Sequence, residues 1–202
     1  MSVAIKTKED YIVSNWSGGS TTQLYLYPPA SSYARRDFLI RVSSATVELE
    51  RSTFTCLPGV DRIILPLHGQ LHLFYQDHGE RLLQPYQQDH FDGGWNTESV
   101  GRATDFNVMT RLGVRASVAV LSPAPTRAAS LLLKATEHLL LFAPQEGVTL
   151  STPSGAAVAL PSWGLAVIEQ ESGTLEISSP TPTKIIACLL YTSPSPRDLS
   201  TS

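Results

Sequence analysis

Short apolar runs separated by turn-forming residues recur along most of the chain, and this pattern restricts the fold more than any other feature. The runs either alternate apolar with polar residues or are continuously apolar, as strands are. Pairs such as Pro58-Gly59 and Gly93-Gly94 interrupt them. Many short strands at regular spacing predict an all-β sandwich or barrel. The predicted strands are Thr22–Tyr27, Phe38–Leu49, Arg62–Leu67, Gln70–Tyr75, Phe106–Thr110, Val114–Leu121, Ser130–Lys134, Leu139–Phe142, Ala157–Leu160, Gly164–Glu169 and Gly173–Ser178.

Two segments leave the organisation of the second half open. Leucine triplets make the stretch from Ser130 to Phe142 compatible with a buried helix or with two strands that turn at Glu137-His138, and we favour the strands. The segment SPAPT, from Ser122 to Thr126, predicts a boundary. We therefore expect a barrel in residues 1–122 and a smaller half in residues 123–187. The smaller half has too few strands to close alone, so it is expected to share strands with the first, with N-terminal residues among the candidates.

The last residues resemble a piece of sequencing adapter. Cys188 to Asp198 reads CLLYTSPSPRD, which can be back-translated in frame to the transposase adapter used in short-read library preparation. We interpret about Cys188 to Ser202, residues 188–202, as a non-native tail that makes few contacts. A disordered native tail rich in serine and proline is the alternative interpretation. On the adapter interpretation, Cys56 is the one native cysteine.

Charge and composition argue against several classes of protein. The 15 basic and 18 acidic residues give a net charge of −3, too weak and negative for a basic nucleic-acid-binding face. No apolar run approaches the roughly 18 residues of a membrane span, and the start of the chain lacks a signal-peptide core. Two cysteines exclude a disulfide scaffold. We expect a soluble cytoplasmic protein with no nucleic-acid or membrane partner, and we leave a homodimer open.

One local pattern resembles the first motif of the cupins, in which two histidines and a glutamate hold a metal ion. Arg62 precedes Gly69 at the glutamate-to-glycine spacing, so an arginine stands where the glutamate would be. The histidine positions fall among Thr55 to Pro58, where no histidine occurs. A guanidinium cannot ligate a metal ion. The pattern therefore predicts a metal-free barrel, with a cation in place of the metal and no cofactor.

The other histidines do not supply a convincing metal site. His68 and His72 are four residues apart, but on strands around Gly69 their side chains point in different directions. His90 stands where the second cupin motif places its histidine, without two further ligands. We predict no metal ligands.

Five blocks of sequence, in order, resemble the HutD/Ves family of bicupin proteins. The blocks are Trp16 to Leu24 (WSGGSTTQL), Arg41 to Ala45 (RVSSA), Pro58 to Arg62 (PGVDR, after Phe54), Phe91 to Gly93 (FDG) and Asp105 to Arg111 (DFNVMTR). The resemblance implies an all-β bicupin, two cupin-like β-barrels sharing strands, with a small-molecule pocket. HutD is associated with histidine utilisation and Ves-like members with stress. The resemblance therefore also implies a regulatory role. It attaches no reaction firmly to the chain.

Three arginines are the first candidates for ligand binding. Arg41, Arg62 and Arg111 lie within or beside apolar strands, where a cation requires a carboxylate or several acceptors. The nearby acids are Asp61, Asp92 and Asp105. Two interpretations remain open: the arginines form structural salt bridges with these acids, or one of them holds an anionic ligand bidentately. Arg62 is the strongest candidate for the second role because it takes the place of the metal in the cupin pattern.

Alternation along one predicted strand adds further candidates. Asn107, Met109 and Arg111 share a strand face that could line a barrel interior. Trp16 is either a core residue or a platform for a ligand. The predicted ligand-binding residues are Arg62, Arg41, Arg111, Asn107, Met109, Trp16, Gln23 and Asp92.

The function predicted from the sequence is binding of a small anionic metabolite, such as a formyl-glutamate-like compound or another carboxylate, by a metal-free bicupin. Two enzyme alternatives stay open. One is an isomerase or hydrolase that uses Asp or His as acid or base, and the other is a metal-dependent cupin oxygenase or isomerase, against which Arg62 argues. A pocket with a strongly perturbed carboxylate or histidine favours an enzyme, whereas a closed, arginine-lined pocket without one favours a binding protein.

Overall fold

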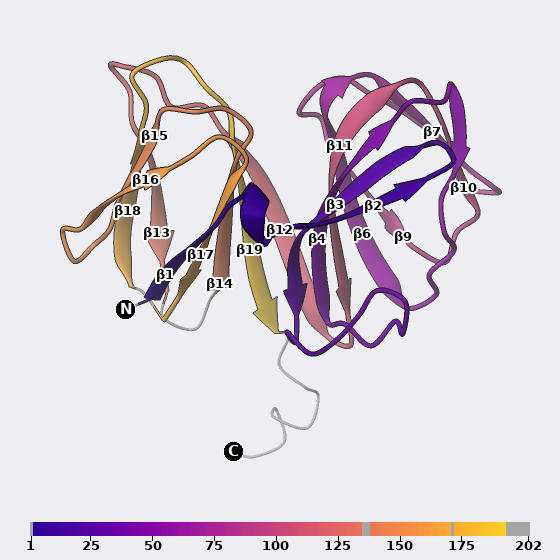
Figure 1. The fold of residues 1–202 in the computed structure, drawn as a ribbon, viewed down its shortest axis with the longest axis horizontal. Coiled ribbons are helices and arrows are strands. Elements are labelled where there is room, and N and C mark those ends of the chain that lie inside the picture. The colour runs from indigo at the N-terminus through magenta and orange to yellow at the C-terminus, as the bar shows by residue number, and fades with distance from the viewer. Residues whose placement is uncertain (1, 135–137, 171, 193–202) are drawn as a thin grey trace. The chain divides into compact units, whose positions relative to one another are not determined.

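A computed structural model describes residues 2–134, 138–170 and 172–192 of the chain (Figure 1). Their regular structure consists of β-strands, as the sequence pattern predicts, and one short 3-10 helix, which it did not predict. In chain order the elements are β1 (Ser2–Lys6), η1 (Lys8–Asp10), β2 (Ile12–Trp16), β3 (Gly19–Tyr27), β4 (Ile40–Val47), β5 (Arg51–Thr53), β6 (Val60–Gly69), β7 (Leu71–Tyr75), β8 (Gly79–Leu83), β9 (Asp89–Asp92), β10 (Thr97–Val100), β11 (Ala103–Arg111), β12 (Val114–Leu121), β13 (Ala129–Leu133), β14 (His138–Ala143), β15 (Val148–Ser151), β16 (Ala157–Leu160), β17 (Gly164–Glu169), β18 (Gly173–Ser178) and β19 (Ile185–Thr192).

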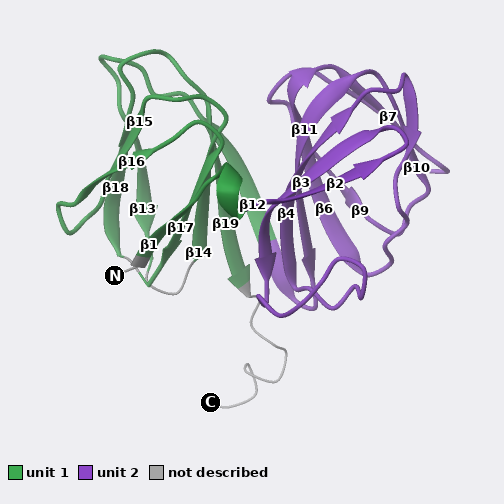
Figure 2. Ribbon diagram, in the orientation of Figure 1, with its two compact units in different colours: residues 1–10, 116–191 green, residues 11–115, 192–202 purple. Residues whose placement is uncertain are grey.

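The chain divides into two compact units, each built from two sheets (Figure 2). Unit 1 contains residues 1–10 and 116–191, with sheets of order β1-β17-β14-β19-β12 and β13-β18-β15-β16. Unit 2 contains residues 11–115, with sheets of order β2-β3-β4-β11-β6-β9 and β5-β10-β7-β8. The all-β prediction is confirmed. The sheets stay separate, so each unit is jelly-roll-like rather than one closed barrel.

The N-terminal strand belongs to the unit formed by the second half of the chain. Ser2–Lys6 pairs antiparallel with β17, with Ala4 opposite Val167. The division between the units falls between Arg115 and Ala116, inside β12, so this one strand contributes residues to both. The sequence analysis put residues 1–122 together, whereas this division places residues 1–10 and 116–122 in unit 1.

The leucine-rich segment from Ser130 to Phe142 forms strands rather than a helix. Its first part is β13, which pairs with β18, and its second part is β14, which pairs with β17 and β19. Leu139, Leu141 and Leu133 are buried in the core of unit 1. His138 begins β14, and Glu137, at the predicted turn, lies outside the described residues.

The segment after Ala187 contributes contacts that the sequence analysis did not expect. Cys188 lies opposite Leu140 and Leu190 opposite His138 in the ladder between β19 and β14, and both side chains are almost fully buried. The expectation of few contacts is therefore wrong for residues 188–190. These residues make contacts because Cys188, Leu189 and Leu190 are apolar, so they extend the pairing of β19 with β14 and bury side chains in the core. Residues 193–202 of the predicted tail lie outside the described residues.

Candidate functional site

Unit 2 contains a cavity of about 430 Å³. That volume lies in the range of small-molecule sites, roughly 300–1,000 Å³. Its lining side chains come from β2 to β6, from β11 and from two connecting segments. Six of the eight predicted ligand-binding residues line it: Arg62, Arg41, Asn107, Met109, Trp16 and Gln23. The strand alternation that suggested Asn107 and Met109 also brings Asp105 into the lining.

The sheet register brings the two buried arginines to either side of one strand. Met109 on β11 lies opposite Arg41 on β4 and also opposite Arg62 on β6. Neighbouring strands are about 4.8 Å apart, so the two arginine backbones are separated by roughly 10 Å. The next row of the same sheet contains Gln23, Ser43 and Asn107. Cations and hydrogen-bonding groups thus share one face of four adjacent strands, β3, β4, β11 and β6.

Arg41 is held by neutral partners. Its Nε donates to Gln23 Oε1 at 3.3 Å and its Nη1 to Ser43 Oγ at 3.0 Å. The guanidinium carbon lies 4.1 Å from the centre of the Tyr33 ring. Burial lowers the pKa of Arg41, and Tyr33 and Asp105 oppose that effect. No carboxylate among the described residues lies within ion-pair distance of this guanidinium.

The guanidinium group of Arg62 has fewer polar contacts than that of Arg41. It is 5% exposed, and its Nε is buried without a hydrogen-bond partner. The guanidinium carbon lies 4.8 Å from the centre of the Phe54 ring and 5.1 Å from that of Phe91. Cation–π contacts of this kind hold the group in place without neutralising it. In the part of the chain that the structure describes, no ion pair or hydrogen bond joins the Arg62 side chain to another residue.

Burial lowers the pKa of Arg62 to about 10, with Asp105 opposing the change. The guanidinium therefore still carries its charge at neutral pH. Together with Arg41 it puts two positive charges and one carboxylate into the lining of the same cavity. The site is net positive whether or not that carboxylate is ionised.

Asp105 is the carboxylate of the cavity. It is 3% exposed, and its Oδ1 accepts a hydrogen bond from the backbone N–H of Ala45 at 3.1 Å. Burial raises the pKa of Asp105 to about 6, against the effects of the Ala45 N–H, Arg62 and Arg41. Sequence reasoning named Asp105 only as an arginine partner. Its alternation with Asn107 and Met109 was the signal that could have placed it in the site.

Other lining groups complete the polar interior. Asn107 is buried, and its Oδ1 has no hydrogen-bond partner. Trp16 is 39% exposed on the outermost strand β2, so it lines the cavity from an exposed position. Gly18 lets the indole approach: a Cβ at Gly18 would lie 2.1 Å from Trp16 Cζ3. Tyr33, Ser43 and Phe54 also line the cavity, although the prediction did not include them.

The structure does not place Arg111 and Asp92 at this cavity. Both line a separate hollow of about 210 Å³ beside Asp61. Arg111 lies opposite Val60 at the end of β11, and Asp92 is an exposed residue of β9 whose Oδ1 accepts from the N–H of Gly94 at 2.7 Å. They therefore do not share a cavity with the other six predicted binding residues. Strand alternation gives the face of a residue but not how far along the strand the cavity extends.

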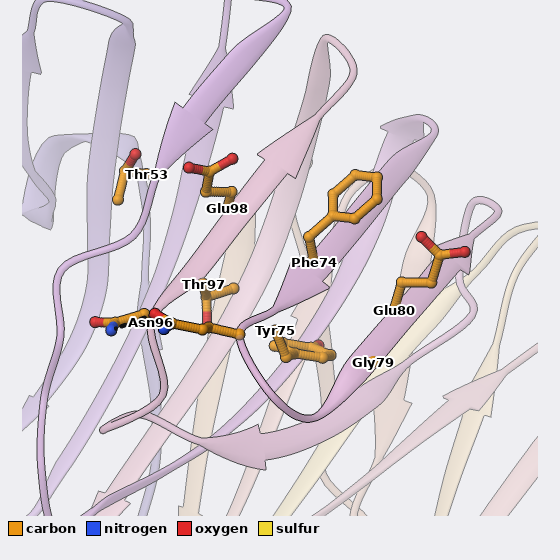
Figure 3. A pocket seen from close by; sticks show the side chains of 9 residues that line it. Thr53, Phe74, Tyr75, Gly79, Glu80, Asn96, Thr97 and Glu98 are labelled. Carbon is orange, nitrogen blue, oxygen red and sulfur yellow. Dashed lines mark hydrogen bonds between the residues drawn. The ribbon is translucent and has the colours of Figure 1, made fainter.

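A third hollow lies over the four-stranded sheet of unit 2 (Figure 3). Its volume is about 600 Å³, and Glu98, Phe74 and Glu80 follow one another across β10, β7 and β8. Both acids have partners, since Glu98 pairs with Arg51 and Glu80 Oε2 lies 3.2 Å from His72 Nε2. It contains none of the predicted binding residues. The arginine cavity is therefore the better candidate site.

The cavity does not fit a metal ion. Two of its side chains are guanidinium groups, which repel a cation and cannot ligate one. Among the described residues, no three His, Cys, Asp or Glu side chains come together in a way that could hold a metal. His72 and His138 lie beside glutamates, and the ring of His78 stacks on that of Trp95 with the ring centres 3.9 Å apart.

No helix in the described ranges has the length and apolar character needed to cross a bilayer.

Comparison with solved structures supports the cupin-like architecture. A conserved protein of unknown function, PA5104 from Pseudomonas aeruginosa PAO1, aligns with a TM-score of 0.82 and 24% identity over 95% of this chain and 100% of its own. HutD from Pseudomonas fluorescens SBW25, solved under a formate condition, gives 0.74 and 20% over 95% and 100%. The bacterial pirin YhhW of Escherichia coli, in complex with nickel(II), gives 0.69 and 7% over 95% and 100%. These likenesses confirm a fold of two cupin-like units.

The comparison with curated proteins gave no match. The model of the HutD family matches residues 8–186, which is most of the chain and both units. This match covers all five sequence blocks that carried the resemblance. The chain therefore belongs to the HutD family.

Proposed function

We propose that the chain binds a small anionic metabolite, a carboxylate, in the cavity of unit 2. The observation that carries this proposal is the pair of buried guanidinium groups, Arg41 and Arg62, for which no described residue supplies an ion pair. An uncompensated buried charge costs several kcal/mol, and a bound anion would remove that cost. A guanidinium can donate two parallel hydrogen bonds to a carboxylate.

The remaining lining groups support a carboxylate rather than a bare inorganic ion. The unpartnered Oδ1 of Asn107 can accept from an N–H or O–H group, which an organic carboxylate can carry, and Phe54 and Tyr33 hold the guanidinium groups in place. A cavity of about 430 Å³ has room for a small dicarboxylate or a formyl-glutamate-like compound. From membership of the family we further propose a cytoplasmic, regulatory role in histidine utilisation or stress response, with the metabolite rather than nucleic acid or membrane as partner.

Replacing Arg62 by methionine is expected to weaken binding of succinate or N-formylglutamate by about 10- to 150-fold. That range corresponds to the roughly 1.5–3 kcal/mol of a charge-assisted hydrogen bond. The fold is expected to survive, because methionine removes an unpaired buried charge while keeping an unbranched side chain. Isothermal titration calorimetry measures the affinity and urea unfolding measures the stability.

The control is Arg111→Met, which removes an arginine of β11 that does not line the cavity. This variant should bind as the unmodified chain does. Equal loss in both variants would point to a general effect of net charge, and no loss in Arg62→Met would contradict the proposal.

A second candidate function rests on Asp105. A buried carboxyl group with a pKa of about 6 in a cavity beside two arginines is suited to transfer protons near neutral pH. The class of reaction would be proton abstraction next to a bound carboxylate. NMR of N-formylglutamate in D₂O tests this: enzyme-dependent loss of the α-proton signal, absent in Asp105→Asn, would favour an enzyme. An unchanged signal in the presence of proven binding would favour a binding protein.

A further inference from the structure

The carboxyl group of Asp105 lies in the same cavity as the two arginines but is not saturated by them. Only its Oδ1 accepts a hydrogen bond, from the Ala45 N–H, and no described residue donates to Oδ2. Neither guanidinium lies within ion-pair distance of it. One oxygen of the acid thus remains available on the cavity side, where the proposed ligand would bind.

An anion bound between Arg41 and Arg62 would bring a second negative charge into the space that Asp105 occupies. Succinate carries two negative charges, which the two guanidinium groups balance, so an ionised Asp105 would leave one excess negative charge in a poorly hydrated site. Uptake of one proton removes that charge. The site is nearly closed to solvent at Asp105, which is 3% exposed, so water screens that charge little. Protonation also turns the free oxygen from an acceptor into a hydrogen-bond donor.

We propose that binding of an anion in the unit 2 cavity is coupled to uptake of one proton by Asp105, which then donates a hydrogen bond to the bound anion. This inference rests on the proposed binding function. It goes beyond that function by assigning the site a pH dependence and a preference for ligands that offer an acceptor oxygen beside Asp105.

The charged and titratable groups around Asp105 are compatible with this role. Arg41 approaches from β4, Arg62 from β6 and Tyr33 from the segment between β3 and β4, whereas Asn107 and Met109, which follow on β11 itself, are neutral. Among the described lining residues there is no histidine. Since burial already raises the pKa of Asp105 to about 6, an added anion would move it into the neutral range.

Calorimetric titration of succinate into the full-length chain at pH 6.5, 7.5 and 8.5 tests the coupling. The affinity is expected to fall as the pH rises above 6.5, by up to tenfold per unit while the pH lies between the pKa values of Asp105 in the free and the anion-bound protein, and to level off at higher pH. Titration at a single pH in two buffers of different ionisation enthalpy should report an uptake close to one proton. This second measurement needs no variant.

Asp105→Asn keeps an oxygen that can accept from the Ala45 N–H but cannot ionise. It should bind succinate with the same affinity at all three pH values and with no proton uptake. Asp92→Asn is the matched control, because this acid lies outside the cavity, and it should keep the pH dependence of the unmodified chain.

The outcomes separate the inference from the function on which it rests. Binding that is lost in Arg62→Met but does not change with pH would overturn the proton coupling and leave the binding function standing. A pH dependence that persists in Asp105→Asn would also overturn the coupling. Absence of binding of succinate and of N-formylglutamate at every pH would overturn both.

Discussion

Ending the chain after Ala187 is expected to lower the free energy of unfolding of unit 1 by about 4 kcal/mol or more. Strand β19 lies between β14 and β12, so losing its residues from Cys188 onward removes backbone pairing from the middle of a sheet. The deletion also removes Cys188 and Leu190, whose side chains are 0% and 2% exposed. Loss of a buried leucine side chain alone costs roughly 2–5 kcal/mol, and each lost ladder hydrogen bond adds about 1 kcal/mol.

Urea unfolding followed by circular dichroism would measure this cost. The matched reference is the chain that ends at Thr192, which keeps the whole of β19. The comparison isolates residues 188–192. A difference below about 0.5 kcal/mol, the size of an ordinary surface effect, would mean that these residues contribute nothing and would restore the interpretation of a tail with few contacts.

The strands could be predicted because their signal is local. Each predicted run overlaps an observed strand, and four agree in both bounds: Val114–Leu121, Ala157–Leu160, Gly164–Glu169 and Gly173–Ser178. Their flanking residues are turn formers, and β-strand alternation needs no knowledge of distant neighbours. The pairing of β1 with β17 is different, since it joins residues from Ser2 and Glu169 to Lys6 and Leu165, about 160 positions apart in the chain. No local pattern specifies such a partner, so the division into units could not be derived with the strands.

The sequence predicted which strand face each site residue occupies, but not which strands lie next to one another. Arg41 and Arg62 were chosen as cations in apolar strands, and their meeting across Met109 follows from register, which the sequence alone does not give. Arg111 has the same strand parity as Met109 but lies at the end of β11, beyond the cavity. The sequence analysis did not place Asp105 in the site, because its raised pKa results from burial among side chains of other strands.

The salt-bridge interpretation of the arginines can now be compared with the geometry. It requires a carboxylate within about 4 Å of a guanidinium, and in the described ranges neither Arg41 nor Arg62 has one. The charges of Asp105 and the arginines still influence one another, since each shifts the pKa of the other. The arrangement is therefore a loose cluster with a cavity between its members. Such a cluster favours a ligand site over a structural ion pair.

Replacing Asp105 by asparagine is expected to stabilise the protein in a pH-dependent way. The pKa of this acid is about 6 in the folded chain, against an ordinary value of 3.8. Below pH 3.8 the carboxyl group is neutral in both states and costs nothing. As the pH rises through 6, the unfolded chain releases the proton more readily, so the folded state loses stability, by about 3 kcal/mol for a shift of about two pKa units. Asparagine has no such loss.

Between pH 3 and pH 7 the free energy of unfolding of Asp105→Asn should therefore rise by about 3 kcal/mol relative to that of the unmodified chain. Above pH 7 the difference between the two should stay constant. Urea unfolding at each pH measures it, and titration of all other groups cancels in the difference. Asp92→Asn removes an exposed acid and should show no comparable trend. If the difference for Asp105→Asn were independent of pH, the carboxyl group would titrate as it does in the unfolded chain. The raised pKa from which a bound anion would shift Asp105 into the neutral range would then be absent.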